Sequence, residues 1–166
     1  MGLFYKSIFQ SCQLQLPTLR SSEAVGVELR DIRTGVVVIN VYRSPSDDIN
    51  HFLIEFQQLL NDLSCILCPD IITGDINIHF EMPYQLRTAR LMKLLYTQRL
   101  YQHIKLSTHS QGGVFDVVVT DAKGIISNIS VEPAHPDLSD HSLIIFSYKV
   151  HIKTKRTGIS KKVECI

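Results

Sequence analysis

Two short polar clusters in this chain hold side chains that could carry out acid–base or metal chemistry. Gly74-Asp75-Ile76-Asn77 directly follows an apolar, β-branched run, and Ser139-Asp140-His141 directly precedes another. Continuous apolar runs are typical of strands that are buried on both faces, so we expect each cluster at the end of a buried strand. Together the clusters offer carboxylates, an amide and an imidazole, which suits metal-assisted phosphoester chemistry.

A further acidic residue lies inside an apolar strand. Asp116 belongs to the run 114–120, whose other members are apolar or β-branched. A lone carboxylate in such a strand needs a partner, and the imidazole of His141 is the natural one. We therefore expect five side chains to converge in one pocket: Asp75, Asn77, Asp116, Asp140 and His141.

Strands and helices alternate along the chain. The apolar rhythm from Ile49 to Leu63 predicts an amphipathic helix with Ser46 as its N-cap. A second helix is predicted from about residue 85 to 101, with Leu86, Ala89, Leu94 and Leu95 facing inward. Strands are predicted over 2–9, 25–29, 36–42, 70–75, near Leu106, and over 114–120, 125–131 and 143–150. This mixture predicts an α/β (α+β) fold with layered sheets.

Composition limits the class of protein further. The chain has 166 residues, enough for one domain, and a net charge of only +1, which gives no global argument for a nucleic-acid partner. Six of the 17 Lys and Arg residues lie in the last 18 positions, so we expect a domain over 1–150 and a basic tail or linker over 151–166. Absence of a long apolar stretch predicts no membrane span, and four cysteines without a disulfide framework favour a reduced, intracellular setting.

Five segments, in order, resemble the endonuclease/exonuclease/phosphatase superfamily, which includes deoxyribonuclease I and the endonuclease domains of non-LTR retrotransposons. The retrotransposon branch is the closest match, because the chain has a Thr-His pair, a glycine pair and then an aliphatic-Asp-aliphatic strand ending in Thr. The segments are Asn40–Pro45, Thr73–Asn77, Ser107–His109, Gly112–Thr120 and Leu138–His141.

The resemblance implies a fold and an activity. The implied fold is a sandwich of two β-sheets packed face to face and flanked by helices. The implied activity is cleavage of DNA phosphodiesters with Mg²⁺ or Mn²⁺, without a small-molecule cofactor, and in the nucleus or cytoplasm.

The resemblance also implies individual roles. Asp75 matches the residue that activates the attacking water, and Asn77 matches the amide that hydrogen-bonds the scissile phosphate. His141 matches the imidazole that stabilises charge on the phosphoryl oxygens, Asp116 the carboxylate that orients it, and Tyr42 a phenol that contacts the phosphate. A metal-side or water-orienting carboxylate and three substrate contacts complete the implied set: Asp140, and Arg43, Thr108 and His109.

The chain departs from the family pattern at its start. The family has an Asn and a principal Glu metal ligand before a strand that Met1–Lys6 resembles. Neither Glu23 nor Glu28 matches that ligand. We therefore expect the first strands to be missing, metal binding to be weakened, activity to be impaired, and an exposed sheet to allow self-association.

Two alternatives stay open. The chain could be a catalytically inactive remnant or a nucleic-acid-binding module with the same fold, or a phosphatase of the same superfamily. Cys65 and Cys68 are interpreted as core residues rather than a zinc site, because no second ligand pair stands at a suitable spacing.

Overall fold

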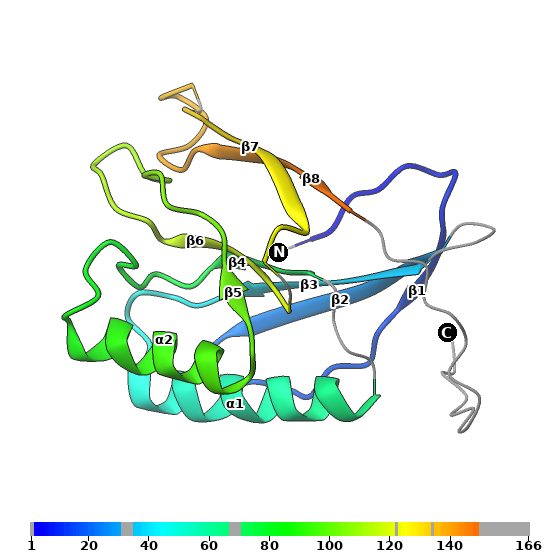
Figure 1. The fold of residues 1–166 in the computed structure, drawn as a ribbon, viewed down its shortest axis with the longest axis horizontal. Coiled ribbons are helices and arrows are strands. Elements are labelled where there is room, and N and C mark those ends of the chain that lie inside the picture. The colour runs from blue at the N-terminus through cyan, green and yellow to red at the C-terminus, as the bar shows by residue number, and fades with distance from the viewer. Residues whose placement is uncertain (1, 31–34, 67–70, 122, 134, 150–166) are drawn as a thin grey trace.

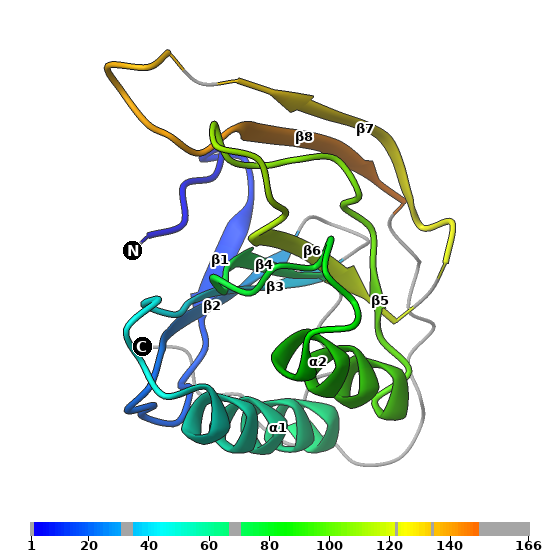
Figure 2. The same ribbon diagram turned by 90° about the vertical axis from the view of Figure 1, so that its left-hand side faces the viewer.

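Three layers make up the computed structural model, which describes residues 2–30, 35–66, 71–121, 123–133 and 135–149. A six-stranded sheet forms the middle layer, with both helices on one face and a two-stranded sheet on the other (Figures 1 and 2). The mixed α/β class and the two layered sheets are therefore as predicted. The helices are α1 (Ile49–Ile66) and α2 (Leu86–Thr97). The strands are β1 (Gln10–Gln13), β2 (Glu23–Arg30), β3 (Gly35–Tyr42), β4 (Ile71–Asp75), β5 (Tyr101–Gln102), β6 (Asp116–Thr120), β7 (Ile126–Glu132) and β8 (Leu143–Tyr148).

The large sheet is mixed. Its strand order is β1-β2-β3-β4-β6-β5, and β7 and β8 form the small sheet. Only β3 and β4 pair in parallel among the described strands, and α1 provides the crossover that a parallel pair requires. The antiparallel pairing of β4 with β6 brings together two segments that are about 40 residues apart in the sequence, including Asp75 opposite Asp116.

The continuous apolar runs arise because the middle sheet is covered on both faces. On β3, Val37, Ile39 and Val41 face the helices, whereas Val36 and Val38 pack toward the small sheet. The strand β6 alternates in the same way. Each strand therefore contributes to two cores, and alternation of apolar with polar residues is lost.

The helix α1 is capped by a different residue from the one predicted. The carboxylate of Asp48 accepts the backbone N–H groups of Asn50 and His51 at 2.8 and 2.9 Å, so Asp48 and not Ser46 is the N-cap. Ser46 bonds to the hydroxyl of Ser44 instead. The apolar face of α1 is buried as expected.

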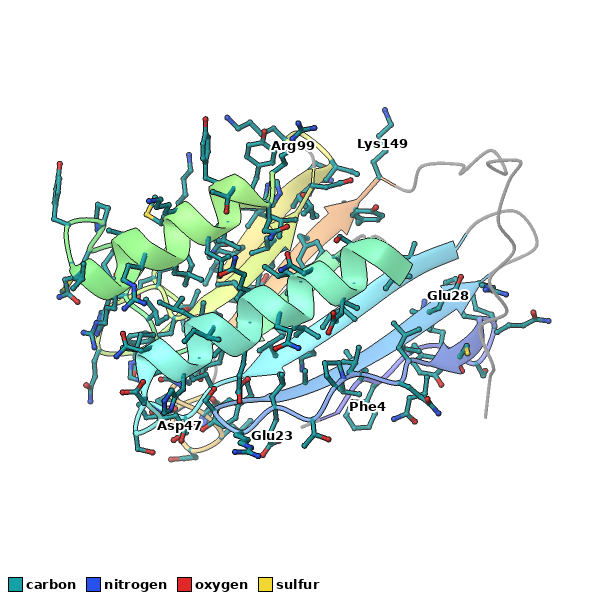
Figure 3. All side chains as sticks on the ribbon, turned by 90° about the horizontal axis from the view of Figure 1, so that it is seen from below. Phe4, Glu23, Glu28, Asp47, Arg99 and Lys149 are labelled. Carbon is teal, nitrogen blue, oxygen red and sulfur yellow. The ribbon has the colours of Figure 1, made fainter. Side chains whose placement is uncertain are left out.

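The helix α2 is shorter than predicted and ends before Arg99 (Figure 3). Arg99 adopts a left-handed conformation (φ 57°), and the N–H of Leu100 bonds to the carbonyl of Leu95 at 2.8 Å, which ends the helix before residue 101. Leu86 and Ala89 are exposed, contrary to expectation. Leu94 and Leu95 are buried as predicted, and Thr88 and Leu91 complete the buried stripe.

Two predicted strands are absent from the described residues. Residues 2–9 form no strand, and the first pairing begins at β1. No strand forms at Leu106 either, and the short β5 precedes it. There the side-chain Oε1 of Gln102 accepts the N–H groups of His103, Ile104 and Val118, and so takes the place of a longer strand ladder.

Several expectations on the periphery have mixed outcomes. Cys12 is disulfide-bonded, so the expectation of reduced cysteines is wrong for this residue. Cys68 and the basic tail over 151–166 lie outside the described residues. Leu143 and Ile145 on β8 are exposed. Self-association through a sheet exposed by missing first strands stays a prediction. Neither described helix has the length and apolarity that a membrane span needs.

We predict that Phe52→Ala lowers the free energy of unfolding by about 3–5 kcal/mol, because removing a fully buried ring leaves a cavity. Phe52 stacks on Phe56 with ring centroids 5.3 Å apart. The matched control is Ile54→Ala on the exposed side of the same helix, with an expected change of about 0.5 kcal/mol or less. Urea unfolding followed by circular dichroism measures both, and equal losses would contradict this assignment of the core.

Candidate active site

Two aspartates lie directly opposite each other in the middle sheet. Asp75 ends β4, Asp116 begins β6, and the two are register partners. Like charges in this position destabilise a sheet. Burial raises the pKa of Asp75, and the neighbouring charge of Asp116 raises it further, against the lowering effect of hydrogen bonds from Asn77. A cationic or hydrogen-bonding partner is therefore needed between the two carboxylates.

His141 supplies that partner. Its Nδ1 lies 2.9 Å from Oδ2 of Asp116, and its Nε2 lies 3.8 Å from Oδ2 of Asp75. The hydrogen bond expected between Asp116 and His141 is thus present. Burial alone would lower the pKa of His141, but the hydrogen bond to Asp116 and the surrounding negative charges outweigh burial and raise it.

A glycine sets the position of Asp75. Gly74 has φ 131°, and a Cβ atom there would lie 1.9 Å from the backbone oxygen of Val41. Only glycine permits this close approach of β4 to β3. Immediately beyond, the N–H of Arg43 bonds to the backbone carbonyl of Asp75 at 2.9 Å. The backbone that carries the carboxylate is therefore fixed from both sides.

A tight turn places Asn77 next to Asp75. Asn77 has φ 50°, and the turn brings it back onto Asp75. Its backbone N–H donates to Oδ1 of Asp75 at 2.9 Å, and its amide donates to Oδ2 of Asp75 and to the carbonyl of Arg43 at 3.0 and 2.8 Å. Both amide hydrogens are thus used within the protein.

The loop that contains Thr108 fixes the start of β6. Thr108 is fully buried, and its Oγ1 accepts the N–H groups of Phe115 and Asp116 at 3.1 and 3.2 Å. Its carbonyl accepts the N–H of Ser142 at 2.8 Å. The side chain of Thr108 is therefore enclosed and positions Asp116, and its substrate contact stays a prediction.

His109 and Asp140 form a second pair beside the first. Nε2 of His109 lies 3.1 Å from Oδ2 of Asp140, and the His109 and His141 rings meet edge to face with centroids 5.0 Å apart. The pKa of Asp140 is lowered, first by its own backbone N–H and then by His109. Asp140 is exposed, so it lies at the rim of the cluster.

The two residues at the end of β3 differ in their accessibility. Arg43 is buried, and its guanidinium donates to the carbonyls of Ile76, Asn77 and Asp47 while lying 5.7 Å from the ring of Phe52. Desolvation lowers its pKa. Arg43 therefore holds the turn after Asp75, and its substrate contact stays a prediction. Tyr42 is 37% exposed and stays available as a predicted phosphate contact.

Three further residues support the cluster, and sequence reasoning gave no role to Phe115 or Glu81. The ring of Phe115 lies edge to face against His79 and His109, with centroids 4.5 and 5.4 Å away. Nδ1 of His79 lies 2.5 Å from Oε1 of Glu81, and Oε2 of Glu81 accepts the N–H of Val114 at 2.8 Å. The two-residue spacing of His79 and Glu81 is the signal in the sequence that could have indicated this pair.

Two groups of side chains could hold a metal ion among the described residues, and both include His141. One is Asp75, Asp116 and His141, and the other is His109, Asp140 and His141. The first offers two carboxylates and fits the oxygen preference of Mg²⁺ or Mn²⁺ better than the second. A cavity of about 1150 Å³ between α2 and residues 99–105 contains none of these ligands.

Comparison with known proteins assigns the family. Residues 36–145 match the family model described as endonuclease-reverse transcriptase, so the chain belongs to that family, within the endonuclease/exonuclease/phosphatase superfamily. The matched range includes Asp75, Thr108 and Asp116 and the residues that hydrogen-bond to them. No curated protein gives a match.

Solved structures share the fold. The endonuclease domain of TRAS1, a telomere-specific non-LTR retrotransposon, is 17% identical with a TM-score of 0.65. That match covers 86% of this chain and 68% of that one. The human nocturnin catalytic domain, solved with a sulfate anion, is 16% identical with a TM-score of 0.53, and the match covers 87% and 62%. This chain thus spans about two thirds of the length of either domain.

We predict that Asp116→Asn lowers the pKa of His141 relative to the native chain, because the charged hydrogen-bond partner is lost. NMR titration of the histidine ring protons measures this shift, with Asp137→Asn, in an exposed pair with His135, as the control that should not change it. An unchanged titration of His141 in Asp116→Asn would contradict the charge assignment.

The same variant should change how stability depends on pH. The native pKa of His141 lies above the ordinary 6.5. The contribution of protonated His141 to the stability of the fold is therefore complete below pH 6.5 and is lost as pH rises through the raised value. We predict that the Asp116→Asn substitution removes this pH dependence. Urea unfolding at a series of pH values measures it, and an identical pH profile in the native and substituted chains would contradict the link between His141 and stability.

We predict that Thr108→Val lowers the free energy of unfolding by about 1–3 kcal/mol, because the N–H groups of Phe115 and Asp116 lose their acceptor. Thr108→Ser is the matched control, since it keeps the oxygen and should retain most of the stability. Chemical unfolding measures both. Equal stability of the Val and Ser variants would show that Oγ1 does not hold this turn.

Proposed function

We propose that the cluster of Asp75, Asp116 and His141 hydrolyses phosphodiester bonds in DNA with the help of a divalent metal ion. The observation that supports this most is the cross-strand pair of aspartates bridged by an imidazole. Membership of an endonuclease-reverse transcriptase family supports a nucleic-acid substrate over a phosphate monoester. The choice of DNA rests on the resemblance to retrotransposon endonucleases.

Asp75 is the proposed general base. Its raised pKa makes the carboxylate a stronger proton acceptor. Asn77 donates two hydrogen bonds to this carboxylate, so its proposed role is to orient Asp75. A contact from Asn77 to the scissile phosphate requires one of its amide bonds to be released.

His141 is the proposed donor to the phosphate. Asp116 holds Nδ1, which leaves Nε2 on the side that faces Asp75. The raised pKa favours the imidazolium, whose Nε2–H can donate to a phosphoryl oxygen as negative charge develops there. Tyr42 is a further proposed phosphate contact at the end of β3.

The carboxylates of Asp75 and Asp116 are proposed to hold the metal ion, which leaves His141 to the phosphate. Bound there, Mg²⁺ or Mn²⁺ would supply charge neutralisation and a more acidic water. Two carboxylates are few ligands for an ion that prefers octahedral oxygen coordination. We therefore propose that metal binding is weak and cleavage is slow in this chain.

A nucleic-acid-binding module without cleavage is the second candidate. The engaged amide of Asn77 favours it, because the amide has no free donor for a phosphate in the present conformation. In this candidate the chain binds DNA without cleaving it, so Asp75 has no chemical role.

We predict slow nicking of supercoiled plasmid with Mn²⁺ or Mg²⁺, and a loss of about 100-fold or more in Asp75→Asn and His141→Ala. Asp62→Asn on α1 is the matched control and should nick like the native chain. Gel electrophoresis over time measures the rates, and a filter-binding assay measures DNA affinity. Nicking that is equal in all four proteins would reject the proposed site, and DNA binding without nicking would support the second candidate.

A further inference from the structure

The second donor set, beside the aspartate pair, is rich in nitrogen. One ligand atom each from His109, Asp140 and His141 lies within 4.8 Å of the others. The side chains of His109 and His141 are 14% and 29% exposed, and that of Asp140 is 68% exposed. An ion can therefore reach the set from solvent, while the two imidazoles are held by the protein.

The backbone under these residues is already fixed. His109 and His141 are opposite each other in an isolated antiparallel bridge between two loops. The N–H of Ser110 donates to the carbonyl of Asp140, and the N–H of Ser142 donates to that of Thr108, both at 2.8 Å. Ligand binding needs no rearrangement of either loop, so the entropy cost of ordering is small.

The two imidazoles differ in whether a ring nitrogen is already free to bind a metal ion. Asp116 engages Nδ1 of His141 at 2.9 Å, which leaves Nε2 as the metal-binding nitrogen, as in carboxylate–histidine–zinc arrangements. In His109 the N–H of Gln111 approaches Nδ1 at 3.2 Å, and Nε2 lies against Asp140. Ligation through Nε2 of His109 moves its proton to Nδ1 and gives up that one exposed bond.

The chemistry of the set selects the kind of ion. Two imidazoles and one carboxylate, with a remaining position open to water, are a ligand set typical of Zn²⁺. Mg²⁺ prefers oxygen ligands and is better served by Asp75 and Asp116. We propose that His109, Asp140 and His141 form a binding site for a transition-metal ion, with Zn²⁺ as its occupant, beside the aspartate pair.

His141 belongs both to this metal site and to the proposed nuclease site. An ion on Nε2 withdraws that nitrogen from a phosphate, so Zn²⁺ should inhibit cleavage rather than support it. This consequence rests on the proposed function, whereas the metal site itself does not.

The experiment uses Co²⁺ as a spectroscopic probe for the full chain at neutral pH. We expect an intense visible d–d band of low-coordinate Co²⁺, loss of that band when Zn²⁺ is added, and persistence of the band in excess Mg²⁺. Calorimetric titration with Zn²⁺ should give one site. Asp140→Asn and His109→Ala should each weaken Zn²⁺ binding by about 10-fold or more.

The matched control is His135→Ala, because His135 and Asp137 form an exposed His–Asp pair without a second histidine among the residues that the structure describes. It should bind Zn²⁺ like the native chain. Asp140→Asn changes an exposed side chain, so the site can be tested even if His109→Ala disturbs the fold. Unchanged Zn²⁺ affinity in Asp140→Asn and His109→Ala, or an equal loss in His135→Ala, would overturn the proposal.

The metal test and the nuclease test fail separately. The Co²⁺ spectrum needs no substrate, so an inactive chain that still gives the band keeps the metal site and loses the proposed nuclease. Where nicking is measurable, Zn²⁺ inhibition is compared with each variant's own rate without Zn²⁺. Inhibition that persists undiminished in Asp140→Asn would also contradict the site.

Discussion

The structure around the site depends on two carboxylates that lie directly opposite each other on neighbouring strands. Asp75 and Asp116 are cross-strand partners, and each is largely removed from water. Neither can be stable there as an isolated charge. The imidazole of His141 satisfies Asp116 directly and lies close to Asp75, while Asn77 satisfies the other side of Asp75. The surrounding loops are organised around these charges.

The fold supports this cluster from three directions. The parallel pairing of β3 and β4, made possible by α1, brings the turn after Asp75 against the end of β3, where the guanidinium of Arg43 holds it. Thr108 holds the beginning of β6, and its carbonyl is bound to the loop that carries His141. The rigidity of the site therefore depends on buried polar residues that never need to contact a substrate. Such support is what precise catalytic geometry requires.

Sequence reasoning located the cluster but could not assign every role. Asp75, Asp116 and His141 were predictable because each is a polar side chain at the end of, or inside, an apolar strand. Arg43 and Thr108 lie in the same motifs, yet whether such a residue faces solvent or bonds to backbone is decided by turns such as the one at Asn77. The strand β5 was missed because the Gln102 side chain replaces ladder bonds, an effect with no periodic pattern. A long amphipathic pattern such as that of α1 predicts the helix by itself. Its N-cap depends on which neighbouring side chain accepts the first backbone N–H groups, here Asp48 and not Ser46.

The cost of Asp116 to the strand is itself an argument about function. Val117, Val118 and Val119 are buried in β6, and a further apolar residue at position 116 would suit that strand better than an acid facing Asp75. The acid gains no ion pair with Lys or Arg among the described residues, and its partner is a histidine whose pKa it raises. Local rules of stability are broken in this way mainly where a side chain has chemistry to perform. The same imidazole lies beside a second donor set, so the ion that the site binds determines whether His141 is available to a phosphate.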